Sequence, residues 1–397
     1  MSGSPSKSLK GGAKTIGSSH FDPVRFLESW NASTRAPQNN DLRAAIMNAF
    51  GLKPTDDYVY HAIASVTLAQ VQVAIDHGSA NGMHAWYRDE AGQQIAPPSQ
   101  ADIEAYTQIF SPTTATSKAL AAFAGNAKKG SLRASISKHL VDNFFPPSKE
   151  SGLVLPAKQK AVPIPNPAFD FWTWSSHCLE WAGPNAHTVN VKQSHHILPV
   201  FYHHFGCVCP TWDALSLISQ LAKPPKAVGA STVERPVLDL GSGNGYWTFL
   251  LRRVGLTVYA VDNALSAWRT MWIGDTISAD AVSFLKTPQK YVKTTSAAQA
   301  IPTASAIGTR GQGAVLLLVY PQVSNDFTPS VLQTFNGDAV VVAGTQNLNG
   351  FTGPPGETVT SWMARERPEF ERVAQIPLPS FAGKDEALFI FVRRKDI

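Results

Sequence analysis

A glycine-rich turn between a hydrophobic segment and a helix start is the part of this sequence best suited to hold a ligand. It reads Pro236-Val-Leu-Asp-Leu-Gly-Ser-Gly-Asn-Gly245 and continues as Tyr246-Trp-Thr-Phe-Leu-Leu. Glycine is needed where a backbone must bend sharply and a ligand must lie directly against it. Free amides at the start of a helix also favour an anionic group. The turn therefore predicts a site for a ligand that carries an anionic group.

An acidic residue after the next hydrophobic segment indicates what that ligand is. Residues 257–261 read Thr-Val-Tyr-Ala-Val, and Asp262 follows them. A carboxylate at the end of this second strand can accept hydrogen bonds from both hydroxyls of a ribose. Together, the turn and Asp262 predict a cofactor that contains adenosine.

The spacing of the glycines distinguishes between adenosine-containing cofactors. Nicotinamide-dependent enzymes prefer G-x-G-x-x-G, whereas Gly241, Gly243 and Gly245 follow the pattern G-x-G-x-G, with Asp239 two residues ahead. This D-x-G-x-G-x-G pattern resembles the first motif of class I S-adenosylmethionine-dependent methyltransferases. The resemblance covers about residues 210–397 and does not identify a subfamily. It implies S-adenosyl-L-methionine as cofactor and a Rossmann-like sheet of seven mostly parallel strands, closed by an antiparallel hairpin.

The resemblance also implies roles for individual residues. Asp262 matches the acid that the family uses on the ribose, and Asp280-Ala281, after the third strand, matches the pair that contacts the adenine. A helix cap is the alternative role for Asp280, and Asp275 competes with it for the adenine. The cofactor-binding residues implied are Asp239, Gly241, Ser242, Gly243, Asn244, Gly245, Asp262, Asn263, Asp280 and Ala281.

Tyr320 and Pro321 follow the predicted fourth strand, where the family places its catalytic loop. Methyl transfer is an in-line displacement, so the enzyme must hold a lone pair about 3 Å from the methyl carbon and exclude water. Families that methylate exocyclic or side-chain nitrogens carry [Asp/Asn/Ser]-Pro-Pro-aromatic here, whereas this sequence has Tyr320-Pro321-Gln322. The tyrosine leaves both nitrogen and oxygen nucleophiles open as acceptors. Packing at the strand end is the alternative role for Tyr320.

Six of the eleven histidines and all three cysteines lie between His177 and Cys209. Four of these side chains could ligate zinc, but no C-x-x-C pair is present, and we predict no metal. The segment directly precedes the cofactor-binding part, where methyltransferases often place a lid over the substrate. A histidine from it could act as a base or bind the acceptor, and ordinary packing is the third possibility.

Two further features bear on the methyl acceptor. Trp172, Trp174 and Trp181 could stack on a flat acceptor such as a base, with core packing as the alternative. Between Glu104 and Asp142 there is no acidic residue. That stretch does hold five basic residues, which could contact phosphates or line a solvated helix face: Lys118, Lys128, Lys129, Arg133 and Lys138. These features slightly favour RNA over a protein or a small molecule as acceptor.

The elements that must position these residues follow from the hydrophobic pattern. The last part of the chain predicts strands at 237–240, 257–261, 277–279, 314–320 and 338–343, and an antiparallel pair at 370–377 and 387–393. The first part predicts helices: one from Asn40 or Asp41 to Gly51, one from Thr55 to Gly78, and others at Ser99, 132–145 and 212–222. The chain is thus divided into a disordered tail (1–20), a helical N-terminal domain (21–145), a proline-rich linker (146–169), an aromatic and histidine-rich lid segment (170–231) and the cofactor-binding domain (232–397).

Composition sets the broad class of the protein. The 397 residues are 44% hydrophobic and 16% charged, with a net charge of +5, which predicts a globular protein with only a mild attraction for anionic partners. No apolar run reaches the length of about 18 residues that a membrane span needs. Three cysteines are too few for a disulfide framework, so we expect the cytoplasm or the nucleus. The N-terminal tail has no arginine, which speaks against a mitochondrial presequence but leaves that compartment open.

Two other functions remain as alternatives to a methyltransferase. An NAD(P)-dependent oxidoreductase would share the sheet, but the glycine spacing and the lack of a Tyr-x-x-x-Lys pair after the fourth strand speak against it. A non-catalytic scaffold with the same fold is the second alternative, because a cofactor pocket does not by itself prove turnover. The sequence makes no prediction about the oligomeric state.

Overall fold

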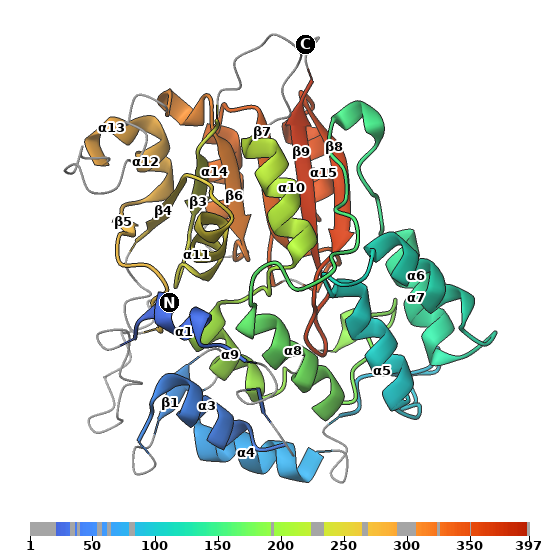
Figure 1. Cartoon of the computed structure of the whole chain (residues 1–397). Helices are drawn as coiled ribbons and strands as arrows, with labels where there is room; N and C mark the ends of the chain where they lie inside the picture. Colours follow the sequence, from blue (N-terminus) through green and yellow to red (C-terminus); the bar gives the residue numbers. More distant parts are fainter. Residues whose placement is uncertain are drawn as a thin grey trace, which may run out of the picture.

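The fold is described from a computed structural model of the chain (Figure 1). The residues that the structure describes are 21–31, 36–37, 40–53, 58–61, 65–78, 84–191, 194–223, 234–263, 269–291, 307–323, 326–349 and 351–394. The predicted tail at residues 1–20 lies outside them.

A seven-stranded mixed sheet forms the centre of the molecule, as predicted. The strand order is β5-β4-β3-β6-β7-β9-β8; the first five are parallel to one another, and β9 runs antiparallel to both of its neighbours. All seven predicted strands are present, with ends displaced by no more than two residues. They are β3 Val237–Leu240, β4 Val258–Asp262, β5 Ile277–Ser278, β6 Val315–Val319, β7 Ala339–Thr345, β8 Phe370–Pro377 and β9 Glu386–Arg393. The sequence prediction of a Rossmann-like sheet with a closing antiparallel hairpin is therefore confirmed.

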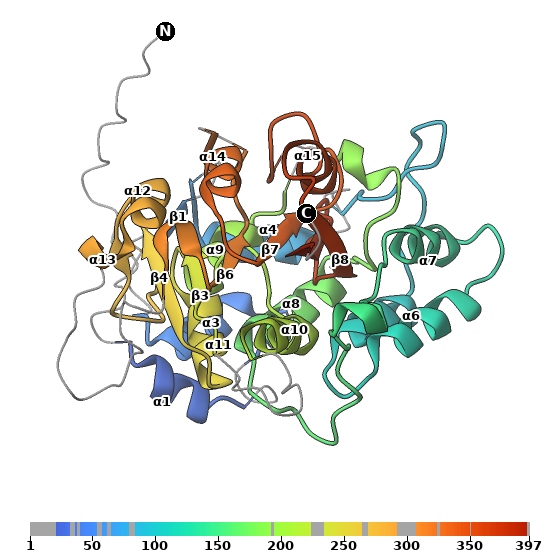
Figure 2. The ribbon, with the colours of Figure 1, turned by 90° about the horizontal axis from the view of Figure 1, so that it is seen from above.

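Helices cover both faces of the sheet (Figure 2). Alternate residues of one strand point to opposite faces, so Val237 of β3 joins the core cluster on one face and Leu238 joins the cluster on the other. Both faces are buried, which explains why the parallel strands read as continuous runs of Val, Leu and Ala. One face carries α10 Trp212–Ala222 and α11 Tyr246–Arg253, and the other carries α12 Ala281–Lys286, α14 Phe327–Thr334 and α15 Val359–Glu366.

A mainly helical layer lies against the carboxyl ends of the parallel strands, and a further group of helices lies beside the sheet (Figure 1). Side chains predicted as N-caps accept hydrogen bonds at the helix starts, among them Asp41, Ser99 and Thr211. The helices are α1 Pro23–Glu28, α3 Leu42–Phe50, α4 Leu68–His77, α5 Gln100–Thr107, α6 Thr116–Gly125, α7 Leu132–Asp142, α8 Pro167–Cys178 and α9 Ile197–Phe205. A short α13, Pro288–Tyr291, follows α12.

The predicted helix from Thr55 to Gly78 is wrong in its first half. Val59–His61 (β1) and Ser65–Thr67 (β2) instead form a two-stranded antiparallel sheet, and α4 begins only after Thr67. Thr67 and Gln70 form a capping box that fixes this helix start. The β-branched residues of this stretch favour a strand, and their spacing of three and four had suggested a helix. Thr55 itself lies outside the described residues.

The proline-rich stretch after α7 packs along the rest of the protein. Phe145 exchanges two backbone hydrogen bonds with Gln375 of β8, at 2.8 and 2.7 Å. The backbone of Val154 binds the side chain of Gln220 on α10 through both its N–H and its carbonyl. One core cluster also includes residues from the N-terminal helices, such as Phe26, together with Val237 of the sheet. The domain boundaries stay predictions, and the helical part and the sheet share this core.

No helix within the described ranges is both long enough and apolar enough to cross a membrane.

Candidate active site at the carboxyl edge of the sheet

The order in which successive strands are added to the sheet changes direction between β3 and β6. From β3 it proceeds to β4 and β5, and it then returns to β6 on the other side of β3. In open parallel sheets a ligand binds in the crevice outside the carboxyl ends of the strands at this switch point. The predicted glycine turn leaves β3 at that point, and Tyr320 leaves β6 beside it.

The glycine turn has the backbone that its sequence predicts. Gly241, Gly243 and Gly245 have φ values of 78, 57 and 77°, in the left-handed region that favours glycine. The amides of Gly241 and Ser242 both donate to the carbonyl of Val261, at 2.8 and 3.1 Å, and so join the turn to β4. A Cβ atom on Gly245 would lie 2.4 Å from Cγ1 of Ile273, so the turn packs too closely for any side chain there.

Asp262 lies beside this turn, as predicted from its place at the end of β4. Its Oδ2 accepts a hydrogen bond from the amide of Gly243 at 2.9 Å. The carboxylate is half-buried. The structure therefore brings the predicted ribose-binding acid and the glycine turn together, with one carboxylate oxygen already committed to the backbone.

Three buried polar atoms around the turn have no hydrogen-bond partner among the described residues. They belong to Asp239 (Oδ1), Ser242 (Oγ) and Asn244 (Nδ2). The other carboxylate oxygen of Asp239 accepts from the hydroxyl of Thr248 at 2.6 Å. Burial raises the pKa of Asp239 to about 7. Buried polar groups normally have partners, so these atoms fit a ligand that supplies both donors and acceptors.

The predicted adenine-binding pair lies at the start of α12. Asp280 is the N-cap of this helix, and its side chain accepts from the amide of Ser283 at 2.8 Å, which is the cap that the sequence left open as an alternative. Ala281 is buried. The competitor Asp275 forms an ion pair with Arg252 at 2.7 Å. Asn263 is exposed directly after β4. An adenine contact by Asp280 and Ala281 stays a prediction.

Tyr320 adopts a strained conformation where β6 ends. Its φ is 50°, which is uncommon for an aromatic residue, and its amide donates to the carbonyl of Ala343 at 2.7 Å. Its ring lies 5.8 Å from the ring of Tyr202 on α9. Burial raises the pKa of the Tyr320 hydroxyl, and the carboxylate of Glu386 raises it further. Strain of this kind gathers at functional sites. Pro321 follows and is buried, and its carbonyl accepts from the amide of Gly353.

A group of buried charged residues beside Tyr320 was missed by the sequence analysis. Lys384, Asp385 and Glu386 are 3%, 0% and 3% exposed. Glu386 begins β9, and because β9 is antiparallel to β7, it lies opposite Thr345 at the carboxyl end of β7. The hydroxyl of Thr345 lies 3.4 Å from Oε2 of Glu386. The signal in the sequence was a Lys-Asp-Glu triplet directly before an apolar strand, where buried charge is rare.

The three charges differ in their surroundings. Asp385 is bound by His139 of α7 at 2.9 Å and by the side chain of Gln346 at 2.6 Å, so it ties α7 to the sheet. Burial raises the pKa of Glu386 to about 7, although the nearby Lys384 opposes the shift. Burial lowers the pKa of Lys384 to about 8, and Glu386 opposes that shift. Two groups that titrate close to neutral pH are typical of sites that transfer protons.

Arg269 and Cys207 connect the two halves of the site. A guanidinium nitrogen of Arg269 lies 3.5 Å from the position of a Cβ on Gly243. Burial raises the pKa of the Cys207 thiol to about 11; the nearby charge of Arg269 opposes this shift and that of Glu386 adds to it. The glycine turn and the buried charges therefore line neighbouring parts of one region.

The buried histidines of the histidine-rich segment lie among packed side chains. His204 of α9 is fully buried and bonds to Tyr60 of β1 (3.1 Å) and Thr270 (2.9 Å). Burial lowers the pKa of His195 and of His203 to about 3, so both stay neutral at pH 7 and are weak bases. No group of three or more metal-binding side chains occurs in the described part of the chain.

The tryptophans predicted as possible stacking residues belong to the core. Trp172 and Trp181 are buried, and the indole N–H groups of both donate to the carbonyl of Ser380. Trp174 packs partly buried against the same cluster. Core packing, the alternative kept for these residues, is what the structure shows.

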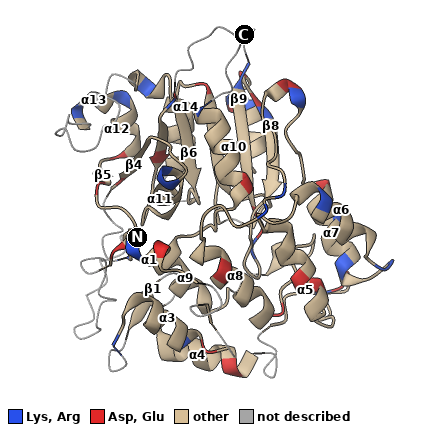
Figure 3. Ribbon diagram, in the orientation of Figure 1, with Lys and Arg blue, Asp and Glu red and all other residues tan. Residues whose placement is uncertain are grey.

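The basic stretch of α6 and α7 is partly neutralised (Figure 3). Arg133 forms an ion pair with Asp102 at 3.0 Å, and Lys138 pairs with Asp142. The remaining three basic residues, Lys118, Lys128 and Lys129, are exposed.

Comparisons with known proteins give distant structural likenesses. No protein-family model and no curated protein matches the sequence. Among solved structures, the chain is similar to an S-adenosylmethionine-dependent methyltransferase from Anabaena variabilis, with 13% identity, TM-score 0.28 and coverage of 40% of this chain and 77% of the other. It is similar to an rRNA methylase from Escherichia coli at 14% identity and TM-score 0.23, over 40% and 57% of the two chains. A methyltransferase of calicheamicin biosynthesis in its S-adenosylhomocysteine-bound form has 13% identity and TM-score 0.28, over 82% and 98%. At these values the fold assignment rests on the strand order of the sheet.

Proposed function

We propose that this protein is an S-adenosyl-L-methionine-dependent methyltransferase. The observation that carries the proposal is the glycine turn at the switch point of the sheet, with Asp262 bound to the amide of Gly243. The turn has the D-x-G-x-G-x-G spacing of class I methyltransferases. The three unpartnered polar atoms of Asp239, Ser242 and Asn244 give it the capacity to bind a ligand with several polar groups.

In this proposal, different residues around the turn contact different parts of the cofactor. Oδ1 of Asp262 accepts from the ribose hydroxyls while Oδ2 keeps the turn in place. Asp239, Ser242 and Asn244 face the amino acid end, and Asn263, Asp280 and Ala281 surround the adenine. When bound, the cofactor supplies an electrophilic methyl group on a sulfonium centre.

Tyr320, Glu386 and Thr345 hold the acceptor in this proposal. Their strands are neighbours in the order β6-β7-β9, so the side chains gather at one point of the carboxyl edge. A carboxylate with a pKa of about 7 can take the proton that a nitrogen or oxygen nucleophile loses. The buried histidines are poor candidates for this role because they are weak bases.

The acceptor classes proposed are RNA, protein and small molecules, with a nitrogen or oxygen nucleophile. The case for RNA rests on Lys118, Lys128 and Lys129. If RNA is the acceptor, its affinity falls steeply with salt, and Lys128→Glu with Lys129→Glu weakens it. RNA binding that is unchanged by this double substitution would remove the argument for a nucleic acid.

Calorimetric titration with S-adenosylmethionine, S-adenosylhomocysteine and NADH tests the cofactor. We expect the first two to bind and NADH not to bind. Gly243→Asp should abolish binding because it adds a side chain and a negative charge at the turn. Asp338→Ala, which removes the ion pair with Arg235 just before β7, is the control. Binding of NADH alone would support the alternative of an NAD(P)-dependent oxidoreductase. If none of the three ligands binds, the alternative of a non-catalytic scaffold is supported.

Asp262 allows a finer comparison of two variants. Asp262→Asn keeps an oxygen for the amide of Gly243 but loses the negative charge, whereas Asp262→Ala loses both. Hydrogen bonds to charged groups contribute about 1.5–3 kcal/mol, so we expect a loss of affinity of about tenfold or more in each variant, larger for alanine. Unchanged affinity in both would place the cofactor elsewhere.

A further inference from the structure

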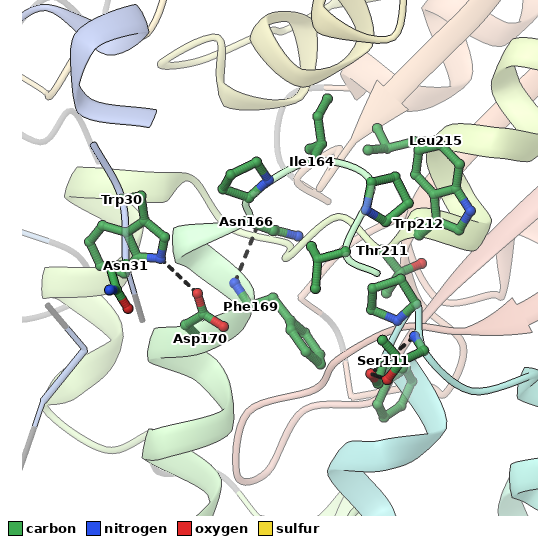
Figure 4. A pocket seen from close by; sticks show the side chains of 16 residues that line it. Trp30, Asn31, Ser111, Ile164, Asn166, Phe169, Asp170, Thr211, Trp212 and Leu215 are labelled. Atoms are coloured by element: carbon green, nitrogen blue, oxygen red, sulfur yellow. Dashed lines mark hydrogen bonds between the residues drawn. The ribbon is translucent and has the colours of Figure 1, made fainter. Parts of the chain in front are cut away.

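A cavity lies between the proline-rich stretch and the starts of α8 and α10 (Figure 4). Its volume is about 500 Å³, within the range of small-molecule sites. Trp30, Asp170 and Asn31 lie on one side, and Trp212 and Leu215 lie on the other, with Asn166 and Phe169 between them. None of the residues of the candidate active site lines it. The cavity is therefore a separate site.

The walls combine aromatic and proline side chains with a single charged group. Trp30, Phe110, Phe169 and Trp212 supply the aromatic surface, and residues 162–165 supply two prolines and two aliphatic side chains. Asp170 is the one charged residue among the lining residues.

Asp170 is held in a fixed orientation with one oxygen to spare. The indole N–H of Trp30 donates to Oδ2 of Asp170 at 2.7 Å. No hydrogen bond to Oδ1 is found among the residues that the structure describes. Burial raises the pKa of Asp170, and the bond from Trp30 opposes this shift only in part. Asp170 is half-buried, so a positive group that enters the cavity would find an opposite charge at its wall.

The wall around Asp170 is preorganised by Asn166. Its Nδ2 donates to the carbonyl of Pro210 at 2.8 Å, and its Oδ1 accepts from the hydroxyl of Tyr246 at 2.7 Å and from the amide of Phe169 at 3.3 Å. These bonds tie the start of α8 to the segment before α10 and to α11. Such rigidity reduces the ordering cost of binding.

We propose that this cavity binds a small organic cation, an alkylated ammonium, with its charge beside Asp170 and its alkyl groups against the aromatic rings. Aromatic faces attract cations, and desolvated aromatic sites recognise quaternary ammonium groups. A metal ion is a poor fit because it needs several oxygen ligands, and Asp170 is the one carboxylate among the described lining residues. A neutral ligand would leave the charge of Asp170 without an opposite charge beside it.

Titration of the full chain with choline and with 3,3-dimethyl-1-butanol tests the proposal. The two molecules have the same shape, and only choline carries a charge. We expect saturable binding of choline, at least tenfold weaker binding of the alcohol, and a shift of the Trp30 indole N–H resonance on addition of choline. Equal binding of both molecules, or no binding of choline at millimolar concentration, would overturn the proposal.

Variants locate the site. Asp170→Asn keeps an acceptor for Trp30 but removes the charge and should weaken choline at least tenfold, and Trp212→Leu should weaken it by removing an aromatic wall. Asp213→Asn is the control: this half-buried carboxylate lies one residue beyond Trp212, accepts a hydrogen bond from the hydroxyl of Thr116 at 2.6 Å and does not line the cavity. Loss of choline binding in the Asp213 variant alone would place the cation elsewhere.

A pH series on the unmodified protein keeps the proposal testable if the Asp170 variant does not fold. Choline affinity should fall as the pH is lowered, because Asp170 takes up a proton. Among the described residues, the charge of Asp170 acts on two other titratable groups, Cys209 and Tyr246; burial raises the pKa of each, so both stay neutral at pH 7. Affinity that does not change with pH would contradict the pairing with Asp170.

Discussion

Replacement of Asp239 by asparagine should make the protein more stable and less able to bind its cofactor. Asp239 is fully buried, and burial raises its pKa from 3.8 to about 7. At 1.36 kcal/mol for each pH unit, this difference corresponds to about 4 kcal/mol. An acid with a raised pKa in the folded state destabilises the fold as its charge forms. The contribution of Asp239 to the free energy of unfolding is therefore most favourable below pH 3.8. It becomes less favourable as the pH rises and is constant above about pH 7.

Urea unfolding at a series of pH values measures this effect. The free energy of unfolding of the unmodified protein should fall relative to that of Asp239→Asn by up to about 4 kcal/mol between pH 4 and 8. Asparagine is neutral throughout and still accepts the hydrogen bond from Thr248. Asp275→Asn, at an exposed ion pair, should not show this pH-dependent gain.

Cofactor titration supplies the second half of the prediction. In the unmodified protein, a donor from the ligand can reach the unpartnered Oδ1 of Asp239, so S-adenosylmethionine should raise stability according to its concentration and affinity. The asparagine variant should gain less from the same concentration. A stability difference that does not depend on pH would refute the reasoning, since it would mean that no buried charge forms at this position.

Three other predictions concern the remaining parts of the site. Glu386→Gln should abolish a rise in kcat/KM as pH increases through about 7, because it removes the group that takes up the proton; a rise that persists in the variant would assign it to another group. Tyr320→Phe should lower kcat while sparing cofactor affinity measured by calorimetry, and normal turnover would leave Tyr320 with a packing role. Gly245→Ala should lower the melting temperature and cofactor affinity together, because its Cβ meets Ile273 at 2.4 Å with φ at 77°; an unchanged melting temperature would contradict that contact.

The sheet could be predicted from sequence because its signals are local. Each buried strand is a short apolar run between turn residues, and the glycines at 241, 243 and 245 report a backbone that other residues adopt with strain. The pairing of Asp262 with the turn also followed from topology alone, since both lie where parallel strands end.

The wrong helix prediction and the missed acceptor residues arise where the local sequence pattern is ambiguous or where the contact joins distant segments. A helix over residues 59–67 is predicted because Val59, Ile63 and Val66, which are four and three residues apart, fit both a helix and a short hairpin, and only the capping box at Thr67 separates the two. The acceptor side was missed because Glu386 reaches Thr345 through the pairing of two strands 41 residues apart. Such a contact leaves no trace in either segment taken alone.

The core cluster shared by the helical layer and one face of the sheet has a consequence for how the protein unfolds. The cluster on the α10 and α11 face of the sheet includes Phe26 and other residues of the helical layer, whereas the opposite cluster contains residues 238–391 alone. A fragment that starts at residue 234 would keep the second cluster and expose the partners that Phe26 and its neighbours cover. We therefore expect the helical layer and that face of the sheet to unfold together, and a fragment cut before β3 to be less stable than the full chain.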